Sequence, residues 1–219
     1  MKLFKNLMNS VKIKQILVIL LLLTLFTFVS AISYVNAVSE DIANSVFRLH
    51  VIANSDSKED QDLKLKVRDK LLSYMNNLSK NCSSKEEVVE MANSHKEDLK
   101  EIAEQVIKEN GFDYEVDVQI GDATFPTKTY GDISLPAGNY DALKVKIGKA
   151  DGQNWWCVMF PPLCFVDVSS GIVPDSSKEE LRENLNEEEY DLISENNDQE
   201  INFKFKLVEF FQNLKLGLQ

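Results

Sequence analysis

The sequence has few residues of the types that mark fibrous, low-complexity or disulfide-rich proteins. Its 219 residues include eight Gly, five Pro and three Cys, and 44% of them are hydrophobic. This composition excludes collagen-like and wholly disordered chains, and three cysteines cannot build a dense disulfide scaffold. The chain is long enough for one ordinary domain with appendages, whose hydrophobic core needs no cross-links.

The signatures of common enzyme classes are also missing. The sequence contains no Walker loop, G-x-G-x-x-G, G-x-S-x-G or H-E-x-x-H motif. It has two His, and its His and Cys residues do not have the close spacing of zinc ligands. The acidic residues after Asp56 lack the Gly and the closing Glu of an EF-hand loop. We therefore expect no metal, no cofactor and no catalytic residue.

Basic residues are scarce outside the N-terminus. Residues 1–37 contain four lysines and no acidic residue, so the other 182 residues hold 20 basic and 35 acidic side chains, a net charge of −15. Such a domain repels phosphate backbones, whose binding needs clustered Lys and Arg. We expect no nucleic-acid partner, and contact with a membrane only through residues 1–37.

Residues 1–37 have the pattern of an export segment. Lysines are followed by the uncharged residues 16–29 and then by the small residues 35–37, which suit a signal-peptidase cut after Ala37. The uncharged run 15–39 is also long enough to span a membrane, so an uncleaved anchor is the alternative. In both cases the lysines keep the N-terminus in the cytoplasm and the remaining chain is exported.

The exported part begins with the periodicities of one strand and two helices. Residues 46–52 alternate apolar and polar side chains, which predicts a strand with Arg48 and His50 on its polar side. The polar residues 54–57 suit a turn and the start of an amphipathic helix. A second amphipathic helix is predicted over residues 84–110, where it begins with a capping box.

Several strands are predicted after these helices. The alternation in residues 112–120 indicates a half-buried strand with an acidic outer face. Residues 140–149 and 155–160 flank Asp-Gly, which predicts a β-hairpin. Residues 163–168 suit one more short strand.

The C-terminal part differs in composition from this predicted domain, residues 38–174. Residues 175–200 hold eleven acidic and two basic side chains, and their thin apolar stripe favours a solvated amphipathic helix over an acidic recognition surface. Residues 201–219 are apolar again and fit a strand or a helix that packs on the domain. We predict an α+β fold: a mixed sheet with a β-α-α-β start, an antiparallel meander and a C-terminal helical segment, behind the N-terminal signal or anchor helix.

The cysteines and histidines allow one enzymatic interpretation. Cys157 and Cys164 flank a Pro-Pro turn, so they form either a disulfide, which export permits, or two buried thiols. Cys157 could also act as a nucleophile with His50 as its base, in an exported cell-envelope hydrolase or transferase. His95 lies on the apolar stripe of its helix, which is typical of a boundary residue.

Three stretches have a denser pattern of specific residues than packing requires. They are residues 48–69, beginning Arg-Leu-His-Val-Ile-Ala-Asn-Ser-Asp, residues 125–140, with Phe-Pro-Thr-Lys-Thr-Tyr-Gly and Leu-Pro-Ala-Gly-Asn-Tyr, and residues 154–167, beginning Asn-Trp-Trp-Cys-Val-Met-Phe-Pro-Pro. In this order they closely resemble the stage II sporulation protein R family of endospore-forming bacteria. The resemblance extends from about Phe47 to Val168, whereas the acidic segment and the tail match only in general character.

The resemblance implies a signalling protein and not an enzyme. Members of this family are made in the forespore, are exported through an N-terminal segment and act in the space between forespore and mother cell. There they activate a membrane-embedded aspartic protease of the sporulation septum, which removes the pro-sequence of the early mother-cell sigma factor. The implied location is the forespore membrane or the intermembrane space, with a tether if residues 1–37 are not removed.

We expect contacts with the protease where loops and aromatic side chains present specific residues. The expected residues come from the first strand and its turn, the Gly- and Pro-rich stretch and the tryptophan pair: Arg48, His50, Asn54, Asp56, Lys128, Tyr130 and Trp155. The alternative for Asn54 and Asp56 is that they only cap the following helix. The variants Arg48→Ala and Tyr130→Ala should lose signalling with little change in melting temperature.

Overall fold

The computed structural model describes residues 2–164 and 173–194, in two units, residues 1–39 and 40–219. Most of helix α1 (Lys2–Ser45) belongs to the first unit. Within it, Lys12–Ala31 is long and apolar enough to cross a membrane, and none of this span is buried. This agrees with a signal sequence or an anchor, and a cut after Ala37 stays a prediction.

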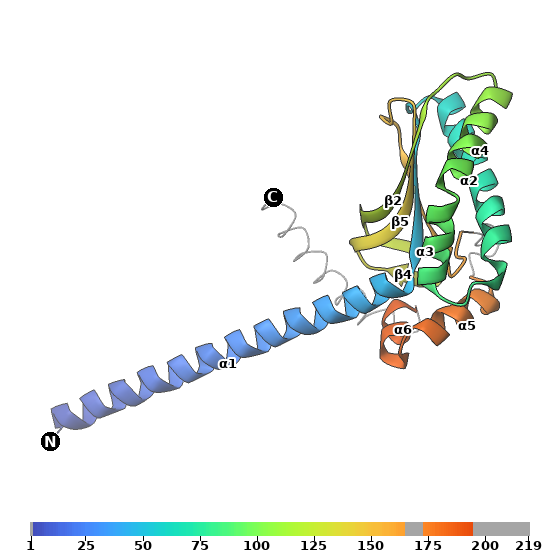
Figure 1. Cartoon of the computed structure of the whole chain (residues 1–219). Coiled ribbons are helices and arrows are strands. Elements are labelled where there is room, and N and C mark those ends of the chain that lie inside the picture. The colour runs from blue at the N-terminus through green and yellow to red at the C-terminus, as the bar shows by residue number, and fades with distance from the viewer. Residues whose placement is uncertain (1, 165–172, 195–219) are drawn as a thin grey trace. The chain divides into compact units, whose positions relative to one another are not determined.

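The second unit has the predicted α+β architecture (Figure 1). Its main sheet contains four strands: β1 (Phe47–Ile52), β2 (Val116–Phe125), β5 (Gly138–Ile147) and β6 (Asn154–Phe160). Their order is β2-β5-β1-β6. The sheet is mixed, because β1 is parallel to β5, whereas β2 with β5 and β1 with β6 are antiparallel pairs.

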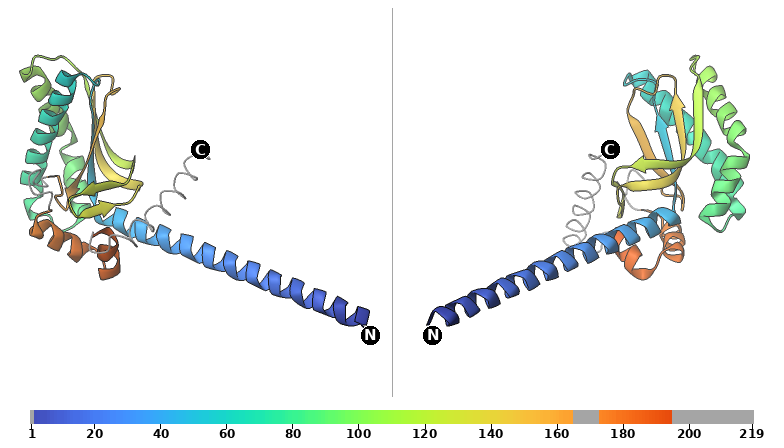
Figure 2. Two further views of the ribbon diagram at one scale, coloured as in Figure 1. Left: turned by 180° about the vertical axis from the view of Figure 1, so that it is seen from behind. Right: turned by 60° about the vertical axis from the view of Figure 1, so that its left-hand side comes forward.

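Helices cover one face of this sheet, as Figures 1 and 2 show. They are α2 (Lys58–Leu78), the short 3-10 helix η1 (Ser79–Asn81), α3 (Lys85–Ser94) and α4 (Lys96–Glu109). The second predicted helix is therefore two helices, which separate at His95. Ser57 is the N-cap of α2 and Ser84 is the N-cap of α3, since each side chain accepts a hydrogen bond from a backbone N–H in the first turn.

The hydrophobic core lies between the helices and the sheet. Phe47, Leu49 and Val51 of β1 point into it, where they meet apolar side chains of α2, α3 and α4. The other side of β1 is buried as well: Arg48 is 0% exposed and His50 is 5% exposed. β1 lies in the middle of the sheet and both sides of this strand are buried, so it has no solvent-facing side, which the alternation of residues 46–52 did not reveal.

The predicted hairpin between residues 140–149 and 155–160 is wrong. The two strands are β5 and β6, and β1 lies between them and pairs with both. The Asp-Gly turn at 151–152 therefore belongs to a connection that passes the end of β1, where the N–H of Gly152 donates to the carbonyl oxygen of Ala53. Turn chemistry is local, whereas strand order depends on which segments pack together.

The strand predicted at 112–120 is displaced. The structure begins β2 at Val116 and continues it to Phe125, where it pairs with β5 along its whole length. Phe112 and Tyr114 precede the strand and stack on each other, with ring centroids 5.3 Å apart. The predicted antiparallel meander is therefore reduced to the antiparallel pair of β2 and β5, because β6 pairs with β1.

A small second sheet and two short helices complete the described part of the domain. β3 (Lys128–Tyr130) and β4 (Ile133–Leu135) form a hairpin between β2 and β5. The predicted acidic helix is two helices, α5 (Asp175–Asn184) and α6 (Glu187–Ile193). Residues 195–219 and most of the strand predicted at 163–168 lie outside the described residues.

These elements are joined by polar contacts. An ion pair links Asp132, in the turn of the β3–β4 hairpin, to Lys178 of α5, and the Asp132 carboxylate also accepts a hydrogen bond from the N–H of Val173. Residue Ser194, after α6, forms an isolated β-bridge with Ile133. The last residues of α1 also take part, because Ser45 donates a hydrogen bond to the carbonyl oxygen of Asn184. The hairpin is therefore joined to α5 and to the residue that follows α6.

Candidate partner-binding site on the outer face of the sheet

Residues of the three dense sequence stretches meet on the face of the main sheet that points away from α2, α3 and α4, here called the outer face. Arg48 and His50 point there from β1, because their neighbours in the strand point into the helix-side core. Phe125, Tyr140 and Trp156 surround them from β2, β5 and β6. Together with Tyr130 of β3, the three aromatic rings form a cluster around the side chains of Arg48 and His50.

Arg48 is held inside this cluster. Its guanidinium carbon lies 4.0 Å from the ring centre of Phe125 and 4.6 Å from that of Tyr140. Its Nη2 donates a hydrogen bond of 2.8 Å to the hydroxyl of Tyr130, whose pKa is raised by burial. Nε and Nη1 are buried and have no hydrogen-bond partner among residues 2–164 and 173–194, and no carboxylate in these ranges forms an ion pair with this side chain.

The aromatic rings offset only part of the cost of burying this charge. Taking an ion out of water costs several kcal/mol even after the protein relaxes. Each desolvated cation–π contact returns about 2 kcal/mol, and the hydrogen bond to Tyr130 about 2 kcal/mol. Two buried nitrogens without partners cost about 1 to 3 kcal/mol each. Arg48 thus remains a buried cation that lacks a counter-ion in the described part of the chain.

His50 is neutral in this environment. Its ring stacks on Trp156, with centroids 3.7 Å apart, and its Nε2 lies 2.7 Å from Oδ1 of Asn154. Burial, together with the charges of Lys144 and Lys146, lowers the pKa of His50 to about 4, although the hydrogen bond with Asn154 opposes this shift. Nε2 therefore carries the proton that it donates to Asn154, and Nδ1 is left as a buried acceptor without a partner in the part of the chain that the structure describes.

Asn54 and Asp56 join two loops and do not cap α2. The side-chain oxygen of Asn54 accepts a hydrogen bond of 3.0 Å from the N–H of Lys149, and Oδ1 of Asp56 accepts one of 2.7 Å from the N–H of Gln153. The N-cap is Ser57, so the capping alternative is wrong. These bonds connect the loop after β1 to the loop between β5 and β6. A direct contact of Asn54 or Asp56 with a partner stays a proposal.

Two glycines are required where these loops approach each other. A Cβ at Gly152 would lie 2.3 Å from the backbone oxygen of Ser55, which is far inside van der Waals contact. Gly148 has a φ of +56°, and a Cβ there would lie 2.4 Å from the side chain of Asn54. Side chains other than hydrogen are excluded from both positions unless the loops separate.

Trp155 lies apart from the outer-face cluster. It packs against the helix-side core, and the guanidinium carbon of Arg68 lies 4.1 Å from the centre of its ring. Trp156, the other member of the pair, is the one beside His50. The sequence predicts one tryptophan on each face of the strand, and a contact of Trp155 with a partner stays a prediction. The register of Trp156 with His50 places Trp156 on the outer face. Lys128 is half-buried at the start of β3, two residues before Tyr130 in the same strand.

The structure brings Arg48, His50 and Tyr130 together and adds three residues that sequence reasoning did not select. These are Phe125, Tyr140 and Trp156, whose rings were present in the dense stretches but could not be assigned to one face without the strand order. Arg48 is completely buried, and its contact with a partner stays a proposal. Its substitution by Ala therefore has a structural cost.

The groups of the alternative enzyme do not meet. Cys157 is opposite Leu49 in the β1–β6 ladder, so it points into the helix-side core, whereas His50 points to the outer face. Cys157 is also joined to Cys164 in a disulfide, with a Cα–Cα distance of 5.4 Å. A disulfide sulfur is not a thiolate nucleophile. The disulfide interpretation of the two cysteines is thereby selected over the buried thiols.

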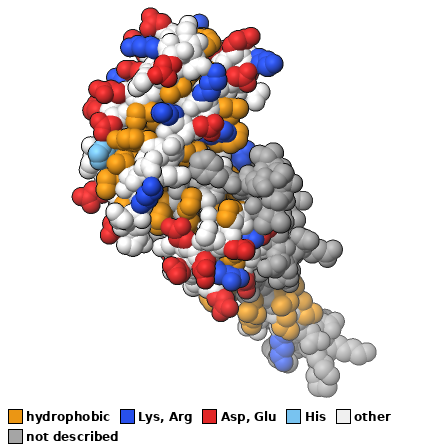
Figure 3. Space-filling view, turned by 90° about the vertical axis from the view of Figure 1, so that its right-hand side faces the viewer, with side chains coloured by type: hydrophobic (Ala, Val, Ile, Leu, Met, Phe, Trp, Pro, Cys, Tyr) orange, Lys and Arg blue, Asp and Glu red, His pale blue; other side chains and the backbone are white. Residues whose placement is uncertain are grey.

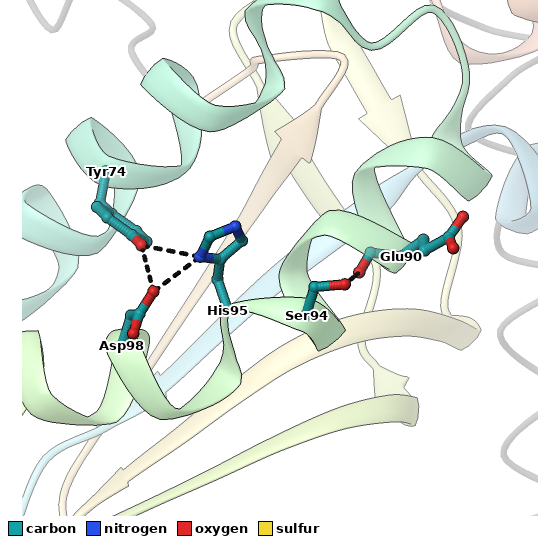
Figure 4. A network of polar contacts seen from close by, with 5 residues as sticks. All are labelled: Tyr74, Glu90, Ser94, His95 and Asp98. Atoms are coloured by element: carbon teal, nitrogen blue, oxygen red, sulfur yellow. Dashed lines mark hydrogen bonds and ion pairs between the residues drawn. The ribbon is translucent and has the colours of Figure 1, made fainter.

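His95 takes part in a small network on the helical face. Nδ1 of His95 lies 2.7 Å from Oδ2 of Asp98, which also accepts a hydrogen bond of 2.8 Å from the hydroxyl of Tyr74 (Figure 4). These bonds lower the pKa of the Asp98 carboxyl. Figure 3 shows this face, on which acidic and basic side chains surround a group of hydrophobic ones. No group of three or more His, Cys, Asp or Glu that could hold a metal ion occurs among residues 2–164 and 173–194.

Comparison with known proteins gives the family of the chain. The profile of the family described as stage II sporulation protein R matches residues 43–170. The protein named stage II sporulation protein R of Bacillus subtilis (strain 168) is 40% identical over 130 residues, which are 59% of this chain and 58% of the relative. The match thus spans little more than half the length of that relative. No solved structure matches. Since the family profile covers more than half of the sequence and all residues of the outer-face cluster, the chain belongs to the stage II sporulation protein R family.

Proposed function

We propose that this protein is an exported sporulation signal. It is made in the forespore and acts from the intermembrane space on a membrane-embedded aspartic protease of the sporulation septum. The protease then cleaves the precursor of the early mother-cell sigma factor. The observation that carries this proposal is the family match over residues 43–170, and the apolar span Lys12–Ala31 supports export or anchoring.

The outer face is the proposed contact surface for the protease. Arg48, His50 and Tyr130 come from two of the sequence stretches that carry the family resemblance, and Trp156 comes from the third. Buried polar atoms without partners are uncommon in folded proteins, and each calls for an explanation. A partner that completes the hydrogen bonds of this cluster provides one. Lys128 and the exposed Asn154 lie at the rim of the cluster and suit polar contacts with the same partner.

Activation requires that the signal bind the active arrangement of the protease more tightly than the inactive one, because equal binding shifts no equilibrium. Stabilising a protease dimer is one such differential interaction. The signal supplies binding free energy and the protease supplies the catalytic aspartates. The enzymatic alternative, a hydrolase or transferase that uses Cys157 and His50, is disfavoured by the disulfide and by the opposite directions of the two side chains.

The test is reconstitution in a host that does not sporulate. The full chain is co-expressed with the membrane protease and the sigma-factor precursor, and cleavage of the precursor is measured by immunoblot. A second strain expresses the chain without residues 1–37. Cleavage that depends on the exported form is the expected result. Absence of cleavage, with the full chain folded and exported, would overturn the proposed function.

A further inference from the structure

We infer that Arg48 is a carboxylate-binding residue, and that an Asp or Glu side chain of the protease supplies the carboxylate: the guanidinium is 0% exposed, and its Nε and Nη1 have no partner among the described residues. This inference rests on the proposed function and deepens it, because it names the chemistry of one contact. Buried charges in proteins are normally paired, so an unpaired guanidinium marks an incomplete site.

The donor set of the site favours a carboxylate. Arg48 offers N–H groups of a planar cation that matches the geometry of a carboxylate, and it has no acceptor of its own. The rings of Phe125 and Tyr140 fix the plane of the guanidinium and exclude water from it. A carboxylate placed there makes charge-assisted hydrogen bonds, which are stronger than the bond to the neutral hydroxyl of Tyr130.

The charge around the cluster is complementary to an acidic segment of a partner. The domain as a whole is strongly acidic, with a net charge of −15 outside residues 1–37. The outer face differs, because Lys144 and Lys146 lie close enough to His50 to lower its pKa. Lys146 pairs with Asp117 at 3.2 Å, whereas Lys144 forms no ion pair with any described residue. An acidic segment is therefore attracted to this part of the surface and repelled by most of the rest.

The β3–β4 hairpin controls access to Arg48. Tyr130 of this hairpin contacts the guanidinium, and the hairpin is a separate two-stranded sheet. It also contacts Lys178 and Val173 through Asp132, and Ser194 through Ile133. A carboxylate that replaces the Tyr130 hydroxyl displaces the hairpin without breaking the ladder of the main sheet. Ligand binding at Arg48 is thereby linked to the position of the hairpin.

The binding step can be measured without the protease, with acetate as the probe. The sequence has three arginines, Arg48, Arg68 and Arg182, so the full chain labelled with ¹⁵N-arginine in detergent micelles gives three Nε–H signals, which single Arg→Lys variants assign. We expect a saturable shift of the Arg48 signal with acetate and none with methyl acetate, the uncharged ester of the same acid. An Arg48 signal that does not respond to acetate, or that responds equally to the ester, would overturn the inference.

Two further variants are informative. One distinguishes a carboxylate of this chain from a carboxylate of the protease, and the other distinguishes failure of the carboxylate contact from failure of the proposed function. Asp167 lies outside the described residues and is the acidic residue next in sequence after β6. If Asp167→Asn shifts the Arg48 signal in the absence of acetate, the counter-ion belongs to this chain and the inference is overturned. Arg48→Met is expected to lose precursor cleavage. Cleavage by Arg48→Met at the wild-type level refutes the carboxylate contact and leaves the signalling function intact, whereas failure of the wild type refutes the function.

Discussion

Replacement of Arg48 by Met should preserve or increase the stability of the domain while it abolishes signalling. Met fills most of the volume of the buried side chain and has no charge to desolvate. Breaking a completed buried ion pair is strongly destabilising, but replacing buried ions by apolar residues of similar size is neutral or stabilising by about 1 to 4 kcal/mol. Arg48 has two unpartnered nitrogens, so we expect its replacement to lie in the second class.

The magnitude follows from the contacts that are lost. Arg48→Met loses the two close ring contacts and the hydrogen bond to Tyr130, which together stabilise the folded state by about 6 kcal/mol. It also removes the cost of desolvating the guanidinium and its two unpaired nitrogens, which is about 5 to 10 kcal/mol. The expected change in the free energy of unfolding therefore lies between a loss of about 1 kcal/mol and a gain of about 4 kcal/mol. Arg48→Ala should be less stable than Arg48→Met by about 2 to 5 kcal/mol, because it leaves a cavity between the rings.

The assay is urea unfolding of the full chain in detergent micelles, followed by tryptophan fluorescence. Both tryptophans, Trp155 and Trp156, belong to the domain, so the signal reports its unfolding. Arg68→Met is the matched control, since Arg68 also lies over an aromatic ring but on the helical face. The control should keep signalling. A loss of more than about 2 kcal/mol in Arg48→Met would show that the aromatic rings already satisfy the charge, and would refute the reasoning that a counter-ion is missing.

Three further predictions concern the same fold. His50 has a folded-state pKa of about 4 against 6.5 for the free side chain, so its contribution to stability is complete above pH 6.5 and is lost as the pH falls toward 4. Between pH 7.5 and pH 4 the free energy of unfolding, measured in urea, should therefore fall by about 2 kcal/mol more in the wild type than in His50→Gln, after allowance for solvent screening. The disulfide closes a loop with a sequence separation of 7, so Cys164→Ser should lower the free energy of unfolding by about 2.5 kcal/mol without abolishing precursor cleavage. Gly152→Ala places a Cβ against the backbone of Ser55 and should cost about 1 to 3 kcal/mol in the same unfolding assay.

Each of these predictions has an outcome that contradicts it. Equal pH dependence of the wild type and His50→Gln would mean that His50 is not kept neutral by its environment. Loss of cleavage in Cys164→Ser while the domain stays folded would revive a chemical role for the cysteines. Gly111→Ala is the control for Gly152→Ala, since Gly111 has positive φ but open space around its Cβ position. A smaller effect at Gly152 than at Gly111 would contradict the close approach of the two loops.

Local signals in the sequence predicted the elements and not their order. Ser84 and the polar residues before α2 marked helix starts, because capping depends on a few adjacent residues. The break at His95 and the insertion of β1 between β5 and β6 depend on tertiary packing, for which a single sequence offers no direct signal. The Asp-Gly turn predicted a hairpin because turn chemistry is local. It does not show whether another strand lies between the two strands that the turn connects.

The candidate site was predicted in part. Alternation in β1 placed Arg48 and His50 on one face, and this is what the structure shows, but the alternation was taken to mean exposure to solvent. The rings that bury Arg48 come from β2, β3 and β5, up to about ninety residues away in sequence, and only the strand order brings them to the same face. Asn54 and Asp56 were selected because they lie in a dense stretch of polar residues. In the structure their side chains join two loops.

The central claim is that the exported domain activates the protease through the outer face of its sheet. The most direct measurement compares precursor cleavage in the reconstituted host for the wild type, Arg48→Met and Arg68→Met, each shown to be folded and exported. The account predicts cleavage with the wild type and with Arg68→Met, and none with Arg48→Met. Equal cleavage with all three chains would contradict the assignment of the outer face as the contact surface.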